Sequence, residues 1–190
     1  MGRTETGFGQ CAAAVGVELG KGGVPGLTSR GPWACGLDDV PEAVLEALRS
    51  MHTALGGDVD LTRSKSERSL VPDFILGSGQ IVEVDEIQHF TSDRKLTLEL
   101  YPDDLSLGFD RDEYARLCEV HGAVADRYRA AKPAADFPFA GGRRAQRAFF
   151  DATRDLLAPF LAGNPVIRAA APECDPGLAF NRVSSLLVGT

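Results

Sequence analysis

The sequence predicts an α/β protein, an α/β sandwich whose central mixed sheet is flanked by helices. Two short apolar runs joined by a glycine-containing turn lie within residues 69–90, an arrangement typical of a β-hairpin. Segments with apolar residues at helical spacing lie before and after it, at 41–55 and 143–160. A chain of 190 residues with 44% hydrophobic content is long enough for one domain with its own core.

Residues 1–37 are rich in glycine and alanine, and we expect them to form an N-terminal arm outside an α/β domain of residues 38–170. Only Cys11 to Leu19 has the composition of a short regular element. Trp33 is expected to anchor the arm by burial against the domain. Residues 171–190 are expected to form a C-terminal tail, for which the pattern predicts no element.

The first helix is expected to begin at Pro41, because two aspartates precede this proline and proline is favoured in a first helical turn. Two glycines, at 56 and 57, end the pattern. Its apolar positions are Val44, Leu45, Leu48, Met51 and Leu55. The polar segment that follows is a candidate loop for phosphate contacts. Its basic residues are Arg63, Lys65 and Arg68.

The hairpin brings acidic side chains together. Glu83 and Asp85 fall on one face of the second strand with Ile81, because successive side chains of a strand alternate between its faces. Asp73, in the first run, is expected beside Glu83. Three carboxylates that converge on a sheet repel one another unless a cation lies between them, and that cation is usually a hard divalent metal. The sequence therefore predicts a metal site.

Two further elements are expected after the hairpin. Alternating apolar residues at 96–100 favour a strand, with a short helix as the alternative. Asp110 is a suitable cap for a helix over residues 111–120, which Gly122 is expected to end.

The last third of the chain contains the longest helical pattern. Residues 123–130 are interpreted as a strand, and residues 143–160 as an amphipathic helix that Pro159 bends or ends. A last short strand is expected within residues 164–169.

Pro72-Asp73 is followed by Val82-Glu83-Val84-Asp85, which begins nine residues after the aspartate, and then by Gln88-His89-Phe90. With this motif, the hairpin resembles the PD-(D/E)XK nuclease superfamily. This segment is similar to restriction-endonuclease-like and very-short-patch-repair-like members that carry Glu-x-Asp-Gly-x-Gln-His. The similarity is specific over residues 69–90 and weaker over 109–122.

This resemblance implies a restriction-endonuclease-like sandwich and a nuclease that holds Mg²⁺ (or Mn²⁺) against the scissile phosphate. By position, Asp73 and Glu83 would be metal ligands. Asp85 shares a strand face with Glu83 and is a candidate third ligand. Glu86 stands where the subgroup has a glycine.

The common family pattern has a catalytic lysine at the position of Asp85. A cation from elsewhere in the chain is therefore expected to assist the attacking water or to stabilise the charge on the phosphate. Lys95 and Lys132 are the candidates, followed by Arg94.

Gln88 and His89 are candidate catalytic residues at the end of the second strand. The amide of Gln88 can orient a water molecule, and His89 can act as a general base or contact phosphate. The alternative is structural, with both side chains hydrogen-bonded to backbone groups at the strand end.

The charge of the chain is unevenly distributed. The net charge is −7, but residues 120–172 carry eight basic side chains against four acidic ones. This asymmetry favours a basic face that contacts nucleic acid, with a solvated, balanced helix as the alternative. The predicted nucleic-acid-binding residues are Arg127, Arg129, Lys132, Arg143, Arg144 and Arg147.

Three hypotheses follow. The first is a metal-dependent nuclease, preferably a DNA endonuclease of restriction, repair or phage-defence type, for which a homodimer is an option. The second is a catalytically inactive nuclease-fold module that binds nucleic acid or a protein. The third is an unrelated α/β protein with a solvated acidic strand.

The four cysteines are widely spaced and expected to be free thiols, and no apolar run is long enough to span a membrane. Residues 1–10 lack the apolar core of a signal peptide. A cytoplasmic location without membrane contact is therefore expected.

Overall fold

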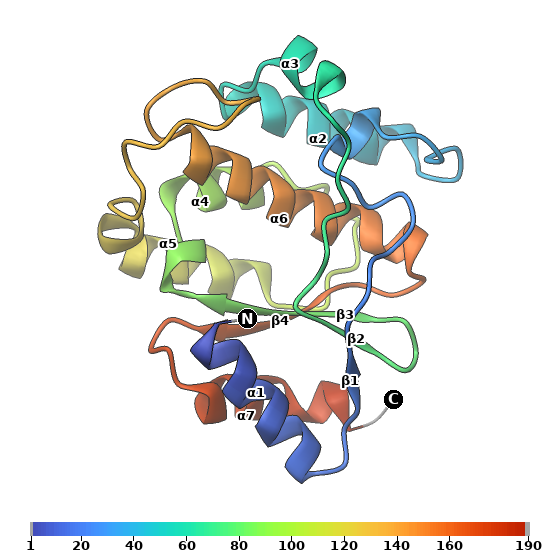
Figure 1. Ribbon diagram of the computed structural model, residues 1–190, viewed down its shortest axis with the longest axis vertical. Helices are drawn as coiled ribbons and strands as arrows, with labels where there is room; N and C mark the ends of the chain where they lie inside the picture. The colour runs from blue at the N-terminus through green and yellow to red at the C-terminus, as the bar shows by residue number, and fades with distance from the viewer. Residues whose placement is uncertain (1, 189–190) are drawn as a thin grey trace.

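The computed structural model describes residues 2–188 and has a mixed four-stranded sheet at its centre, in the order β1-β2-β3-β4 (Figure 1). The strands are β1 (Leu19–Gly20), β2 (Phe74–Leu76), β3 (Ile81–Glu86) and β4 (Ile167–Ala171). The pairs β1–β2 and β2–β3 are antiparallel, and β4 is parallel to β3. Helices cover both faces of the sheet, so the predicted α/β sandwich with a mixed sheet is confirmed.

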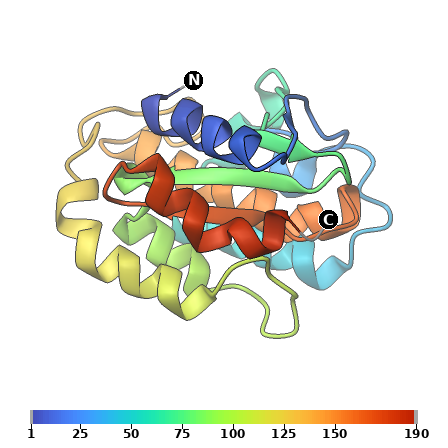
Figure 2. The same ribbon diagram turned by 90° about the horizontal axis from the view of Figure 1, so that it is seen from below.

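One face of the sheet is covered by α1 (Arg3–Ala14) and α7 (Pro176–Leu187), which lie side by side across the strands (Figure 2). The contact is apolar. The ring of Phe8 lies 5.9 Å from that of Phe74 and 5.7 Å from that of Phe180, centroid to centroid. Val82 and Val84 of β3 belong to the same buried cluster. This face of the sheet therefore forms an apolar layer.

The other face is covered by α4 (Ser92–Glu99), α5 (Arg111–Ala125) and α6 (Gly142–Leu161) (Figure 1). A second row, α2 (Glu42–Ala54) with α3 (Val59–Ser64), packs behind α6. Two short 3₁₀ helices, η1 (Gly31–Trp33) and η2 (Ile87–His89), complete the elements of the described chain. The larger of the two hydrophobic clusters joins residues of α2, α4, α5 and α6 to this face of the sheet.

The hairpin prediction is confirmed. In β2 and β3, Phe74 pairs with Val82 and Ile75 with Ile81. Gly79 has φ +86° in the connecting turn, a conformation that glycine adopts without steric cost. The same register places Asp73 opposite Glu83.

The helices predicted at Pro41 and at residues 143–160 are confirmed as α2 and α6, and Pro159 lies in the last turn of α6. The two ends of the chain differ from expectation, because α1 and β1 lie within the arm and α7 forms most of the tail. Residues 189–190 of that tail lie outside the described residues. Thr4, Phe8 and Ala12 are the buried positions of α1. They lie four residues apart and form the helix face that packs against the sheet.

Two strand predictions are wrong. Residues 96–100 lie in and just after α4, the alternative considered for them, because Thr91 caps this helix by accepting a hydrogen bond from the Arg94 N–H. Residues 123–130 complete α5 and form turns beyond it. Gly122 is buried within α5, where it faces the backbone of Phe90, and does not end the helix.

Among the described residues, no helix is both long enough and apolar enough to cross a membrane.

Candidate functional site

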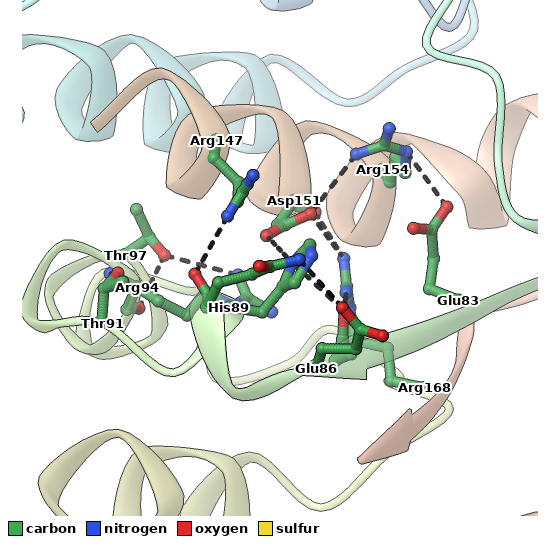
Figure 3. Close-up of polar contacts among 12 residues, drawn as sticks. Glu83, Glu86, His89, Thr91, Arg94, Thr97, Arg147, Asp151, Arg154 and Arg168 are labelled. Carbon is green, nitrogen blue, oxygen red and sulfur yellow. Dashed lines mark hydrogen bonds and ion pairs between the residues drawn. The ribbon is translucent and has the colours of Figure 1, made fainter. Parts of the chain in front are cut away.

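The face of the sheet below α6 is polar. Glu83 and Asp85 point to this face with Ile81, as the strand alternation predicts, and are only 4% and 1% exposed. Arg168 on the neighbouring strand β4 is also buried there. From α6, the side chains of Asp151, Arg154 and Asp155 reach the same layer and bond to these groups. In Figure 3, ion pairs link Glu83 to Arg154, Arg154 to Asp151 and Asp151 to Arg168.

Asp73 and Glu83 open into one pocket of about 190 Å³. The Oδ2 atom of Asp73 accepts a hydrogen bond of 2.9 Å from the backbone N–H of Val84, which fixes this carboxylate against β3. The remainder of the pocket is formed by Val71, His89, Arg143, Arg147, Phe150, Asp151 and Arg154. The predicted pair of carboxylates therefore shares its pocket with three arginines and a histidine.

Glu83 is the least satisfied carboxylate of the site. The Nε atom of Arg154 lies 3.2 Å from its Oε1 atom, yet neither atom has a hydrogen-bond partner among the described residues. Burial raises the pKa of Glu83 to about 7 against the opposing effect of Arg154. Burial also raises the pKa of Asp73, against the Val84 hydrogen bond. Both carboxylates would consequently gain from a cation in the pocket.

Asp85 has a different environment from Glu83. Its two oxygens accept hydrogen bonds of 2.9 and 2.8 Å from Nη1 of Arg168, and Oδ2 accepts a third, of 3.1 Å, from the Tyr114 hydroxyl. Asp85 does not line the pocket of Asp73 and Glu83. The structure therefore does not bring Asp85 together with them as the expected third ligand, because Arg168 already supplies its positive charge.

Arg168 and Arg94 join this region into a closed network. The Nε of Arg168 donates to Asp155 at 2.7 Å, and Nη2 of Arg94 donates to the other oxygen of Asp155 at 2.6 Å. The Tyr101 hydroxyl also donates to Asp155, at 2.8 Å. Arg94, the third candidate for a catalytic cation, is 2% exposed and fully engaged in this structural role.

His89 lies at the edge of the pocket, between Glu83 and the hydrogen-bonded network around Asp85 (Figure 3). Its Nδ1 atom is 3.0 Å from Oδ2 of Asp151 and 3.3 Å from Oδ1 of Asp85. Burial alone would lower the pKa of His89, but these two carboxylates outweigh it and raise the pKa. Burial would raise the pKa of Asp151, and His89 and Arg168 hold it well below its usual range. The ionised Asp151 therefore accepts a hydrogen bond from Nδ1–H of His89, which leaves Nε2 for proton exchange.

Gln88 lies outside the pocket. Its side-chain amide donates to Glu86 at 3.2 Å, and its backbone carbonyl accepts a hydrogen bond of 3.2 Å from Arg147. Gln88 therefore positions an arginine through its backbone, whereas its side chain is held at the end of β3.

The two lysines proposed as catalytic cations lie elsewhere. Lys95 forms surface ion pairs with Glu99 and Glu119, at 3.3 and 3.0 Å. Lys132 is exposed in the loop before α6 and does not line the pocket. This placement does not support the prediction that one of them serves the carboxylates, because neither lysine lines the pocket.

The cations that do line the pocket come from α6. Arg143 and Arg147 were predicted to bind nucleic acid, and Arg154 was not assigned to the site. The three share one side of the helix, because they are separated by four and seven residues. This spacing is visible in the sequence, but the side of the helix that meets the carboxylates is not.

The other predicted nucleic-acid-binding arginines are divided between two surroundings. Arg144 forms an ion pair of 2.6 Å with Asp93, which joins α6 to α4. Arg127 and Arg129 are exposed just beyond α5. The guanidinium groups of Arg129 and Arg147 lie 5.3 and 5.5 Å from the ring centroid of Tyr128. Arg129 and Arg147 thus extend the positive charge of the pocket onto the surface.

No group of three or more histidine, cysteine, aspartate or glutamate side chains within residues 2–188 is arranged to hold a metal ion. The chain matches no protein-family model, no curated protein and no solved structure. Any functional assignment therefore depends on the geometry of the pocket.

Proposed function

We propose that this protein is a metal-dependent phosphodiesterase that cleaves nucleic acid, with DNA as the preferred substrate and Mg²⁺ or Mn²⁺ as cofactor. The observation that carries the proposal is the composition of the 190 Å³ pocket. Asp73, immediately before β2, and Glu83 on β3 face three arginines, a histidine and Asp151. Carboxylates bind metal ions and arginines bind phosphate oxygens. A phosphodiester with a bound metal ion would satisfy both sets of side chains.

The two carboxylates fit a hard divalent cation. Glu83 has a buried oxygen without a hydrogen-bond donor, and Asp73 faces the same pocket. Mg²⁺ usually takes only one or two protein carboxylates and keeps several waters, so Asp73 and Glu83 suffice as ligands. Arg154 would remain paired when Glu83 binds a cation, because its Nη1 also donates to Asp151 at 3.3 Å. When bound, the metal would activate water and neutralise phosphate charge.

The remaining pocket residues have roles that their surroundings support. Arg143, Arg147 and Arg154 are placed to bind the phosphate and to stabilise the negative charge that grows on it during cleavage. They would replace the lysine missing from the family pattern. His89 would exchange a proton with the attacking or leaving oxygen through Nε2, because Asp151 holds Nδ1.

The same pocket supports the proposed relationship to the PD-(D/E)XK nucleases, in which an aspartate and a glutamate on adjacent strands hold the metal. Glu83 lies on β3, and Asp73 lies opposite it, one residue before the paired strand β2. Roles in restriction, repair or phage defence remain within this proposal. We also propose a cytoplasmic location, because all four cysteines are free thiols, a state that reducing compartments maintain.

A module that binds nucleic acid without cleaving it is the second candidate. The ion pair of Arg154 with Glu83 favours it, since this guanidinium already supplies a positive charge at the metal position. The distribution of arginines on α6 would serve binding equally well.

Cleavage of plasmid, linear and single-stranded DNA and of RNA, with Mg²⁺ or Mn²⁺, tests the proposal. Asp73→Asn and Glu83→Gln are the variants that remove metal ligands, and Glu99→Gln is the matched control because Glu99 is exposed on α4. We expect the wild type and the control to cut, and both ligand variants to lose at least about 100-fold in rate. Chelation of the metal should abolish cleavage.

Calorimetry with Mn²⁺ separates the two candidates. Metal binding that disappears in Glu83→Gln, together with cleavage, supports the nuclease. Nucleic-acid binding without cleavage or metal binding supports the second candidate and contradicts the first.

A further inference from the structure

A second pocket adjoins the candidate active site. Its volume is about 480 Å³, within the range of roughly 300–1,000 Å³ typical of small-ligand sites. Arg143 and Phe150 line both pockets, so the two are neighbours on α6. The opposite wall is the chain between α3 and β2, which runs past α6 in Figure 1.

The cations of this second pocket are incompletely neutralised. Lys65 pairs with the buried Asp136. Arg68 and Arg143 have no carboxylate partner within residues 2–188, although Arg143 donates to the side chain of Gln146. Unpaired guanidinium groups at a pocket favour an anionic ligand, and phosphate is the anion that their geometry suits.

The remaining lining suits a flat, polar ring system. Phe150 presents an aromatic ring, with the Lys65 ammonium 5.3 Å from its centroid. The hydroxyls of Ser66 and Ser69 make no hydrogen bond within the described chain and are therefore available to a ligand. An aromatic ring, free hydroxyls and unpaired arginines are together the groups that bind a nucleotide: stacking for the base, hydrogen bonds for its edge and charge for its phosphate.

We propose that this pocket receives an unpaired nucleotide next to the phosphate held by Asp73, Glu83 and the α6 arginines. The inference rests on the proposed function and specifies its substrate class: nucleic acid that is single-stranded or carries a bulged or flipped-out base. A stacked, paired base cannot enter a pocket between a helix and a loop, so it must leave the stack first. Arg143, which is common to both pockets, would contact the phosphate that links the bound nucleotide to the cleavage position.

Binding measurements test this inference independently of cleavage. Fluorescence anisotropy is measured in Ca²⁺, which takes the same carboxylate oxygens as Mg²⁺. The probes are a fully paired DNA duplex and the same duplex with one unpaired nucleotide. Ser66→Trp fills the pocket from an exposed position, and Ser50→Trp on the exposed side of α2 is the matched control. Phe150→Leu removes the ring without filling the space.

We expect the duplex with the unpaired nucleotide to bind about tenfold more tightly than the paired one. Ser66→Trp and Phe150→Leu should each reduce this preference to within about twofold, whereas Ser50→Trp should retain it. Equal binding of the two duplexes, or a preference that both pocket variants retain, would overturn the inference. Cleavage without the preference leaves the nuclease proposal intact and refutes only the nucleotide pocket. The preference without any cleavage supports the pocket and refutes the nuclease.

Discussion

Glu83 and Asp85 lie two residues apart on the same face of β3, and both are almost completely buried, but their surroundings differ. Three hydrogen bonds from Arg168 and Tyr114 saturate Asp85. Glu83 has one ion pair of poor geometry, with Arg154, and faces a pocket. Two equivalent positions of one strand have thus become a structural carboxylate and a candidate functional one.

The difference arises from the side chain of Arg168. In the register of β3 and β4, Arg168 is the partner of Glu83, yet its guanidinium group bonds to Asp85 and Asp155. Glu83 is therefore left with the counterion that α6 provides. Burial alone does not distinguish a structural carboxylate from a functional one. The number and geometry of the donors around it do.

The largest expected effect concerns the closed network around Asp85. Arg168→Leu should lower the free energy of unfolding by about 3–5 kcal/mol, because it leaves buried carboxylates without their counterion. Urea unfolding at neutral pH measures this loss. Arg182→Leu is the control, since Arg182 pairs with Glu173 at the surface and exposed pairs contribute about 1 kcal/mol or less. A loss no greater than that of the control would show that the network does not stabilise the fold.

Replacing Glu83, in contrast to Arg168, should stabilise the fold at high pH. The pKa of Glu83 rises from 4.5 to about 7 on burial, so this group stabilises the fold below pH 4.5 and loses that contribution as pH rises through 7. At 1.36 kcal/mol per pKa unit, the contribution lost is about 3 kcal/mol. Glu83→Gln lacks this ionisation, so its stability relative to wild type should increase between pH 5 and pH 8.

Chemical unfolding at both pH values, without divalent metal, measures this difference. Glu99→Gln, an exposed substitution, should show no such trend. If the stability difference between Glu83→Gln and wild type is the same at pH 5 and pH 8, Glu83 titrates normally. The surroundings of Glu83 and Asp85 would then differ less in their effect on ionisation than their hydrogen bonds indicate.

His89 connects the two regions, and its replacement should affect catalysis more than folding. His89→Gln should reduce cleavage by about 100-fold, a typical contribution of a general acid or base. Because the carboxylates raise the pKa of His89, the rise of the wild-type rate with pH should lie above pH 6.5 and vanish in the variant. His121→Gln, in a different pocket, is the control. An unchanged pH profile in His89→Gln would contradict proton transfer by this residue.

The smallest expected effect is that of Lys95, which the sequence offered as the missing cation. Lys95→Ala should leave the cleavage rate within about twofold of wild type, because this ammonium group forms only surface pairs on α4. The same rate assay measures it, beside Arg154→Ala, which we expect to be strongly impaired. A large loss in Lys95→Ala would require the positive charge of the pocket to be reassigned.

The sequence by itself determined the elements that depend on local patterns. The glycine-containing turn and the alternation at 81–85 predicted the hairpin, the shared face of Glu83 and Asp85 and the position of Asp73 opposite Glu83. The helices at Pro41 and at 143–160 followed from apolar spacing in the same way. These features involve neighbours within a few residues, so their geometry is fixed by strand and helix periods.

The tertiary structure decided what these groups contact. Arg168 follows Asp85 by 83 residues and reaches it only because β4 pairs with β3 in parallel, and Arg154 reaches Glu83 only because α6 crosses the sheet. No local pattern specifies such pairing. The same holds for α1, a helix that contains glycines and is stabilised by packing on the sheet, since most helical stability in proteins comes from tertiary contacts. The chain alone thus supplied the carboxylates, and long-range packing determined which of them was left without a satisfying partner.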